Sequence, residues 1–135
     1  MSKNDFERNE RFRKGEALRR EVLGSAHVDR SLGAATDDPF LMPIQQLTVE
    51  FRWGTIWSRP GLPRKTRSFI CIAFLAALGK HDELRTHLIG ALNNGATWEE
   101  ITEVLLQAAL YCGFPVGLEC FRIAKEVLDG HGVEA

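Results

Sequence analysis

The sequence lacks an excess of charge of either sign. Its 17 Lys and Arg residues against 18 Asp and Glu residues give a formal net charge of -1 at pH 7. This balance argues against the broad basic face that non-specific nucleic-acid binding needs. An uncharged apolar run of membrane-spanning length is also missing, and the charged N-terminal stretch MSKNDFERNERFRKGEALRRE does not resemble a signal peptide. We therefore predict a cytoplasmic protein whose partners include neither nucleic acid nor membrane.

Motifs for cofactors and metals are missing as well. The sequence has no H-x-x-x-H or paired-cysteine spacing for a metal, no glycine-rich phosphate loop and no G-x-S-x-G elbow. We expect neither a cofactor nor a metal. The three cysteines, Cys71, Cys112 and Cys120, are predicted to be small buried hydrophobic residues in a reducing compartment.

Helical periodicity dominates the chain, and no stretch alternates at the period of a strand. The length of 135 residues suits one domain, so we predict a single all-α domain over residues 1–135. The pattern predicts about six helices, separated by a loop over residues 24–43 and shorter turns. Their expected ranges are 5–23, 44–57, 63–78, 82–93, a fifth between Thr97 and Gly113, and 116–129.

Several helix ends carry recognisable signals. Gly79 and Gly95 are expected to close helices in a left-handed conformation, which glycine adopts without steric penalty. Thr97 followed by Glu100 predicts a capping box, in which each side chain accepts a hydrogen bond from the other residue's backbone N–H. The helix over 63–78 is apolar on every side from Phe69 to Leu78. One neighbouring layer cannot cover such a helix, so we predict a homo-oligomer.

The stretch RWGTIWSRPGLPRKTRS, residues 52–68, gathers cations around two tryptophans. Arginine pairs with carboxylates through two parallel hydrogen bonds, and such bonds strengthen where aromatic walls exclude water. A small anionic carboxylate would fit this setting. Two plainer interpretations stay open, since the cations could be a solvated charge run around a helix boundary and Trp53 and Trp57 could belong to the core.

His87 lies in the middle of a predicted helix, where it has no capping or turn role. A pKa near neutrality would suit proton transfer, although a structural histidine held by a hydrogen bond is the alternative. Glu83, four residues earlier, lies on the same helical face and could orient the ring or form a solvated pair.

Several motifs together resemble the carboxymuconolactone decarboxylase family, and in particular its short stand-alone enzymes of the protocatechuate pathway. The resemblance covers about residues 15–130 and rests on WG-x-x-W-x-RPGL with the following TRS, His87, NNG, EE-I-x-EVLLQ and YCG-x-P. It implies an alkylhydroperoxidase-like helical bundle that assembles into a ring-like oligomer, a trimer or a hexamer.

Two features of the sequence depart from relatives in this family. The thiol peroxidases carry C-x-x-C-x-x-x-H with the histidine at the position of His87, so their cysteines would fall on Lys80 and Glu83. A thiol-dependent peroxidase is therefore disfavoured. After YCG-x-P, Leu118 and Arg122 stand where the pathway enzymes have Asn and His, which leaves the true substrate open.

The resemblance implies decarboxylation of 4-carboxymuconolactone, or a related small lactone, to 3-oxoadipate enol-lactone and carbon dioxide in aromatic-compound catabolism. A non-catalytic member that binds a small acid, or one that serves as an assembly subunit, is the alternative. The candidate site residues come from the chemistry that this reaction needs. Expected in catalysis are His87 as general acid, Arg67 as anion clamp, and Glu50 and Tyr111 as weaker candidates; expected in substrate binding are Arg52, Trp53, Trp57 and Arg64.

Overall fold

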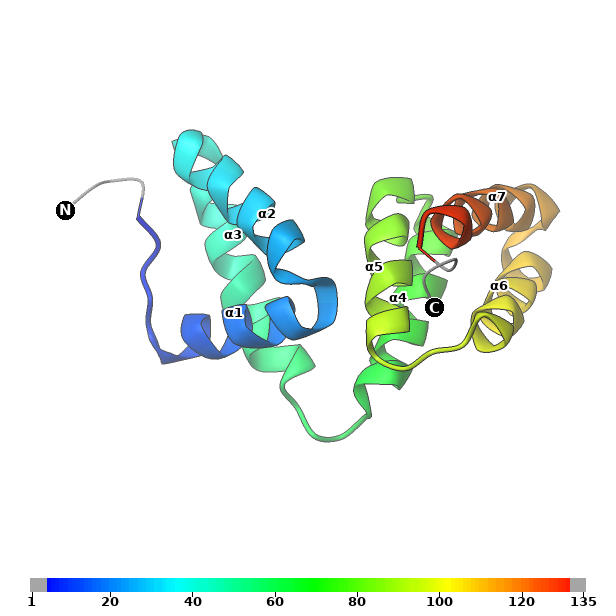
Figure 1. Cartoon of the computed structure of the whole chain (residues 1–135), viewed down its shortest axis with the longest axis horizontal. Coiled ribbons are helices and arrows are strands. Elements are labelled where there is room, and N and C mark those ends of the chain that lie inside the picture. Colours follow the sequence, from blue (N-terminus) through cyan, green and yellow to red (C-terminus); the bar gives the residue numbers. More distant parts are fainter. Residues whose placement is uncertain (1–4, 132–135) are drawn as a thin grey trace. The chain divides into compact units, whose positions relative to one another are not determined.

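A computed structural model describes residues 5–131, and within that range every regular element is a helix and there is no strand (Figure 1). The predicted all-α class is confirmed. The chain divides into two compact units, Met1–Leu62 and Pro63–Ala135, each with its own internal packing. The prediction of a single domain stays a prediction. Among the residues described, no helix has the length and apolar character needed to cross a membrane.

The first unit is built from α1 and α2 together with a bent helical segment. Its elements are α1 (Glu10–Leu23), α2 (Ser25–Asp37), the 3-10 helix η1 (Pro39–Leu41), α3 (Met42–Leu47) and the π-helix η2 (Thr48–Trp57). A small apolar cluster fills this unit, with Leu41 and Met42 packed against it. Its buried members are Phe6, Phe12, Val28, Leu32, Ala35 and Val49.

The predicted loop over residues 24–43 was wrong, because most of it forms α2. Val28, Leu32 and Ala35 recur at helical spacing and are buried. The polar and small residues between them occupy the other faces of α2, and their loop-like composition hid the helix. The structure therefore has seven α-helices over residues 5–131 where about six were predicted.

The first and second predicted helices also needed correction. Helix α1 begins at Glu10 rather than Asp5, because the Asn9 side chain accepts a hydrogen bond from the Phe12 N–H and caps the helix there. The predicted helix over 44–57 is continuous with α3, but from Thr48 onward it has the wider π winding. Such winding has no periodic signature in a sequence and is frequent at functional sites.

Helix α1 and η2 meet at two glycines. A Cβ atom on Gly15 would overlap the carbonyl oxygen of Val49, and one on Gly54 would overlap that of Arg11. In both cases the obstructing atom belongs to the backbone and cannot move aside. The two helices can therefore approach this closely only because both positions lack a side chain.

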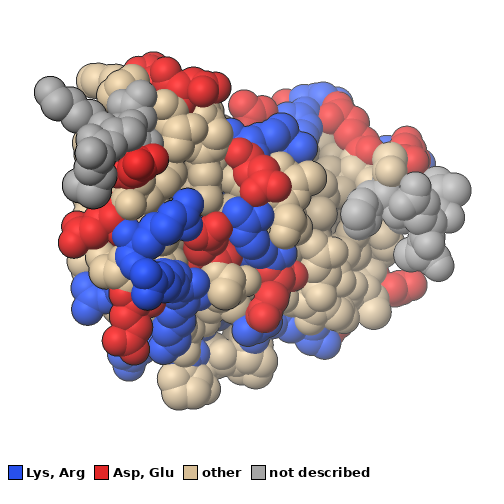
Figure 2. Space-filling model, turned by 60° about the vertical axis from the view of Figure 1, so that its left-hand side comes forward, with Lys and Arg blue, Asp and Glu red and all other residues tan. Residues whose placement is uncertain are grey.

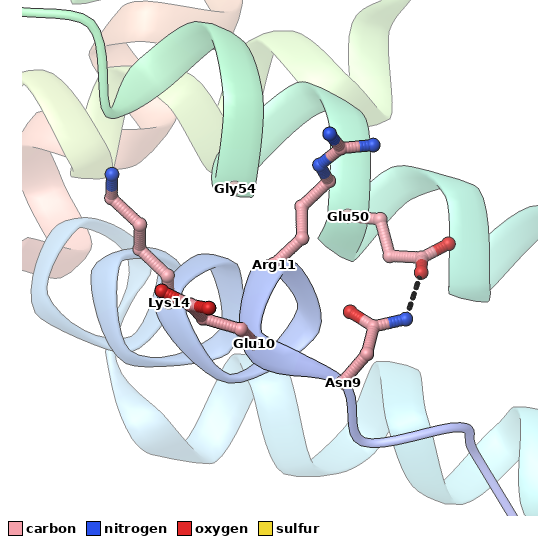
Figure 3. Close-up of a pocket in the computed structure, with 6 residues that line it drawn as sticks. All are labelled: Asn9, Glu10, Arg11, Lys14, Glu50 and Gly54. Carbon is pink, nitrogen blue, oxygen red and sulfur yellow. Dashed lines mark hydrogen bonds between the residues drawn. The ribbon is translucent and has the colours of Figure 1, made fainter.

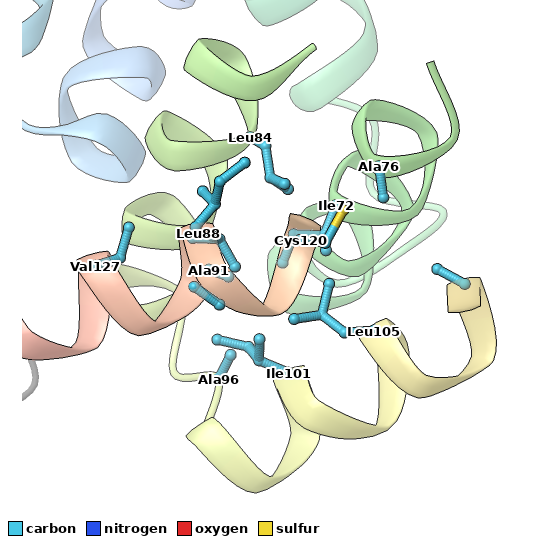
Figure 4. Packing of buried hydrophobic residues seen from close by; sticks show 13 residues of the cluster. Ile72, Ala76, Leu84, Leu88, Ala91, Ala96, Ile101, Leu105, Cys120 and Val127 are labelled. Atoms are coloured by element: carbon cyan, nitrogen blue, oxygen red, sulfur yellow. The ribbon is translucent and has the colours of Figure 1, made fainter. Parts of the chain in front are cut away.

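Four helices form the second unit around a common apolar cluster: α4 (Arg64–Leu78), α5 (His81–Asn93), α6 (Trp98–Cys112) and α7 (Phe114–His131). Figure 4 shows side chains from all four helices converging on this cluster. Its largest fully buried members are Ile72, Leu84, Leu88, Ile101, Leu105 and Ile123. Predicted and observed helices agree to within about two residues in this unit.

The predicted helix ends of the second unit are confirmed. Gly79 has φ 69° and Gly95 has φ 91°, both in the region that favours glycine. Thr97 and Glu100 form both hydrogen bonds of the capping box. The last helix begins two residues earlier than predicted, at Phe114, because Pro115 is tolerated in a first turn, where its missing N–H costs nothing.

The cysteine prediction holds for one residue of three. Cys120 is buried, and burial raises the pKa of its thiol. Cys71 is partly buried, whereas Cys112 is exposed at the end of α6. The prediction that all three are buried was therefore wrong for Cys112, since a helix end has solvent on one side.

Candidate active site

The basic stretch that drew attention in the sequence spans the end of one unit and the start of the next. Four of the predicted site residues belong to each unit. The first unit carries Glu50, Arg52, Trp53 and Trp57, and the second carries Arg64, Arg67, Tyr111 and His87.

In the second unit, two of the predicted arginines share the first turn of α4. Pro63 is the N-cap residue, with extended backbone at φ -61° and ψ 152°, and Arg64 is the first helical residue. Arg64 is exposed and Arg67 is partly buried. The partial positive charge at a helix N-terminus adds to that of the guanidinium groups. This end of α4 therefore has the electrostatic character expected of a carboxylate-binding site.

The lysine between these arginines has a different partner. Lys65 Nζ lies 3.1 Å from Glu100 Oε2, in the capping box of α6. The pKa of Glu100 is lowered by the hydrogen bond from the Thr97 backbone N–H and then by Lys65. Lys65 thus ties α4 to α6, and the arginines are the better candidates for holding an anion.

Sequence reasoning missed two polar residues beside this turn. Asn94 Nδ2, at the end of α5, donates to Ser68 Oγ at 2.8 Å and approaches the Arg64 carbonyl oxygen at 3.4 Å. Ser68 is fully buried. The NNG turn was visible in the sequence as a helix end, but nothing in its spacing showed that the asparagine side chain reaches α4.

His87 lies on the buried face of α5, with 5% of its surface exposed. It shares that face with Leu84, Leu88 and Ala91. A position seven residues further along a helix lies on nearly the same face, two turns away, and for His87 that position is Asn94. A histidine shielded from water is suited to controlled proton transfer. Glu83, in contrast, is exposed.

The two tryptophans of the first unit are buried and stacked. The ring centroids of Trp53 and Trp57 are 4.7 Å apart, with an interplanar angle of 25°. Trp53 is completely buried and Trp57 is 5% exposed. Arg52, on the same π-helix, is exposed. The sequence left open whether these tryptophans belong to the core. Both are buried, so both contribute to packing in the first unit.

Glu50 lines an open pocket of about 420 Å³ in the first unit, with Asn9, Glu10, Arg11, Lys14 and Gly54. Figure 3 shows the Arg11 and Lys14 side chains extending from α1 on either side of Gly54. Asn9 Nδ2 donates to Glu50 Oε2. The carboxylate therefore has a structural hydrogen bond beside the cap of α1, which weakens the case for Glu50 as a catalytic acid.

Tyr111 is 84% exposed. It lines a mainly apolar groove of about 360 Å³ between α4 and α6, with residues that include Phe69, Ile70 and Val104. None of Arg64, Arg67 and His87 lines this groove. Tyr111 thus lines a groove to which the arginine turn does not contribute, and with Glu50 it stays one of the two weaker predicted candidates.

On the face shown in Figure 2, acidic and basic side chains lie beside one another instead of forming one basic field. Within residues 5–131, no three His, Cys, Asp or Glu side chains gather as possible ligands of a metal ion.

Comparison with known proteins gives one family and two well-covered relatives. Residues 43–126 match the model of the carboxymuconolactone decarboxylase family. The chain is 45% identical over 124 residues to a 4-carboxymuconolactone decarboxylase of Acinetobacter baylyi, covering 92% of this chain and 91% of that protein. It is 40% identical over 126 residues to the nitrosuccinic acid decarboxylase npaB of Metarhizium robertsii, covering 93% and 87%.

Proposed function

Because the chain belongs to the carboxymuconolactone decarboxylase family, as the sequence motifs indicated, we propose that it is a carboxy-lyase that removes carbon dioxide from a small anionic substrate without a cofactor. Two relatives that align over most of their length are both decarboxylases by name. Their substrates differ, however, so membership of the family supports the reaction type more strongly than any one substrate.

The two named substrates share a chemical property. In 4-carboxymuconolactone, electrons left by the departing carboxylate can delocalise into the conjugated lactone carbonyl. In nitrosuccinic acid, electrons left beside the nitro group can delocalise onto its oxygens. We propose a substrate of this kind, with a carboxylate to be lost, an internal electron sink and further negative charge for binding. 4-Carboxymuconolactone is the preferred candidate because its decarboxylase is the more similar relative.

The two departures from the pathway enzymes lie on α7. Leu118 is 72% exposed. The Arg122 guanidinium donates to Glu126 Oε1 at 3.0 Å and also to Glu119. Arg122 is therefore occupied in a surface charge network on its own helix. We therefore propose either the lactone or a related small acid as the substrate.

The proposed reaction breaks one carbon–carbon bond and forms one carbon–hydrogen bond. The bond to the departing carboxylate breaks, and its electron pair moves into the conjugated lactone to give a dienolate while carbon dioxide leaves. The dienolate then takes a proton on carbon, which yields the enol-lactone. The protein has to hold the substrate, stabilise the developing negative oxygen and deliver the proton.

We assign these tasks by the character of each residue. Arg67, with Arg64 beside it, would bind the carboxylate that is retained, through charge-assisted hydrogen bonds at the N-terminus of α4. His87 would donate the proton. In the first unit, Arg52, Trp53 and Trp57 stay proposed substrate-binding residues, as the sequence suggested. Glu50 and Tyr111 stay as secondary candidates for the proton donor.

One observation carries this assignment. The arginines at the start of α4 and the buried His87 on α5 lie in the same unit, on consecutive helices. An anion clamp and a proton donor are the two groups that a decarboxylase without a cofactor needs from its side chains. No specific observation favours the thiol-dependent alternative, whose cysteine positions are Lys80 and Glu83 in this chain.

Kinetics of two variants test the assignment. His87→Gln should lower kcat by roughly 100-fold or more, the usual contribution of a general acid, with little change in KM. Arg67→Ala should raise KM, and should also lower kcat if the clamp positions the reacting carbon. Loss of lactone absorbance measures turnover, and circular dichroism verifies folding. Unchanged kcat in His87→Gln would exclude His87 as the acid and direct attention to Tyr111 or Glu50.

Substrate choice and thiol chemistry need separate controls. The wild-type protein should decarboxylate 4-carboxymuconolactone or nitrosuccinic acid, and failure with both would contradict the proposed function. A variant in which Cys71, Cys112 and Cys120 are all replaced by serine should keep its turnover. Loss of activity in a folded cysteine-free variant would support the thiol-dependent alternative instead.

We also propose that the protein works as a cytoplasmic homo-oligomer, a trimer or a hexamer. The support lies in large apolar side chains on α4, α6 and α7 that are exposed in the single chain: Phe74, Leu78, Leu106, Leu110, Phe114 and Leu118. Contiguous exposed apolar surface is typical of protein–protein interfaces. Light scattering at micromolar concentration should give a mass three or six times 15.2 kDa, and a monomer would contradict this proposal.

A further inference from the structure

One side chain crosses between the two helices that carry the proposed anion clamp and the proposed acid. We infer that Asn94 and Ser68 form a positioning pair, which holds the arginine-bearing first turn of α4 in register with α5. The inference rests on the proposed function, since it assigns a role to residues that support Arg64, Arg67 and His87. Neither member of the pair is proposed to touch the substrate.

The geometry of Asn94 suits this role. Its backbone N–H is hydrogen-bonded to the Gly90 and Ala91 carbonyls, so the residue is fixed to the end of α5. Its side-chain amide then reaches α4, where Nδ2 donates to Ser68 Oγ at 2.8 Å and approaches the Arg64 carbonyl oxygen at 3.4 Å. The same amide nitrogen thus contacts both ends of one helical turn.

The residues on either side of this contact explain what it positions. Arg67 immediately precedes Ser68 in α4, and Arg64 supplies the second contact of the asparagine amide. On the other helix, His87 lies two turns before Asn94 on nearly the same face. The hydrogen bond therefore fixes how far the arginine turn can slide or tilt relative to the helix that carries the histidine.

The residue types fit a positioning role better than simple core packing. Ser68 is fully buried, and a buried hydroxyl is stable only with a hydrogen-bond partner. An asparagine amide supplies N–H donors without adding negative charge. An aspartate at position 94 would lack those donors and would place a carboxylate beside the arginines, where it would compete with an anionic substrate.

A comparison of four variants tests the inference: Asn94→Ala, Ser68→Ala, the double variant and Ile123→Val. Asn94 has φ -86°, so alanine is accommodated without backbone strain. Each single variant should raise KM by roughly 3- to 10-fold, the effect of losing one hydrogen bond, with a smaller change in kcat. The double variant should be no worse than the more affected single variant, because the two residues act as one unit.

Ile123→Val is the control for a merely structural effect. Ile123 is buried in the same unit, on α7, and its valine variant should lower the melting temperature while leaving KM unchanged. Two results would overturn the inference. One is an equal change in KM in Asn94→Ala and Ile123→Val variants of matched melting temperature. The other is a double variant whose change in KM equals the product of the two single changes. An active wild type with unaltered KM in Asn94→Ala overturns this inference alone. A wild type inactive on both candidate substrates overturns the proposed function, and this inference with it.

Discussion

The two units of the chain are stabilised in different ways. In the second unit, four helices bury a broad cluster of aliphatic side chains. In the first unit the apolar cluster is smaller, and α1 and η2 meet through backbone contact at Gly15 and Gly54. Side-chain packing can relax around a substitution, whereas backbone contact cannot. The first unit should therefore tolerate substitutions at its helix crossing less well than the second unit tolerates them in its apolar cluster.

Ion pairs do not account for this difference, because both units have them. In the first unit, the Arg20 guanidinium lies 2.8 Å from Glu16 and 2.8 Å from Asp29, which ties α1 to α2. Burial alone would raise the pKa of Glu16, but hydrogen bonds from Arg20 and Arg8 outweigh it and lower that pKa. Surface ion pairs of this kind contribute little individually. The glycine crossing is thus the more sensitive feature of the first unit.

Gly15→Ala should have the largest effect on stability. Its new Cβ would overlap the Val49 carbonyl oxygen, so α1 and η2 would have to separate. We expect the free energy of unfolding to fall by roughly 4 kcal/mol or more, as in the most destabilising core substitutions. Thermal unfolding followed by circular dichroism measures it. Gly33→Ala is the matched control, because a Cβ at this α2 position meets nothing within 4 Å and should be neutral or slightly stabilising. Equal behaviour of the two variants would contradict the view that close backbone contact at Gly15 makes the crossing of α1 and η2 sensitive.

Leu105→Ala should cause a smaller loss in the second unit. Leu105 is 1% exposed and lies in the centre of the cluster. Truncating its side chain leaves a cavity that neighbouring side chains only partly fill. We therefore expect the free energy of unfolding to fall by about 3 kcal/mol. Glu103→Ala, at an exposed position on the same helix, should change stability by less than about 1 kcal/mol. Denaturant unfolding of both variants at one protein concentration makes the comparison, and a loss for Glu103→Ala as large as that for Leu105→Ala would contradict it.

The second unit was the more predictable from sequence. Its helices have clear apolar spacing, and Gly79, Gly95 and the Thr97–Glu100 capping box marked three of their ends correctly. In the first unit the apolar residues are sparser and polar residues fill the exposed face of α2. Local composition then pointed to a loop, although Val28, Leu32 and Ala35 already had helical spacing.

The candidate site was predictable only in part. Residue chemistry led us to predict Arg64, Arg67 and His87, which lie on the consecutive helices α4 and α5; their roles stay predictions. The contact between Asn94 and Ser68 was not predictable, because it joins positions 26 residues apart through a side chain. The π winding of η2 was also hidden, since a change in backbone hydrogen bonding leaves no spacing pattern in so short a segment.

Thr97→Ala should have a modest effect, because it removes one side-chain cap. The Thr97 side chain accepts a hydrogen bond from the Glu100 N–H at the start of α6. Its loss should cost about 1 kcal/mol, as is typical for an N-cap threonine. Thr97→Ser is the control, since it keeps the hydroxyl and should restore most of the stability. A Thr97→Ser variant as unstable as Thr97→Ala would show that the methyl group, rather than the cap, matters here.

The smallest expected effect depends on pH and concerns Glu100. Its pKa is lowered below the ordinary value of 4.5 by the Thr97 backbone N–H and by Lys65. A carboxylate whose pKa is lower in the folded state stabilises that state above the unfolded pKa, and this contribution is lost as the pH falls through the folded pKa. Glu100→Gln keeps an acceptor for the Thr97 N–H but loses the charge facing Lys65. The variant should therefore melt slightly below the wild type at pH 7, and the difference should shrink as the pH falls below 4.5. Glu103→Gln, an exposed change on the same helix, controls for the loss of one negative charge. A difference in melting temperature between Glu100→Gln and wild type that stays the same as the pH falls would show that the ionised carboxylate contributes nothing to the start of α6.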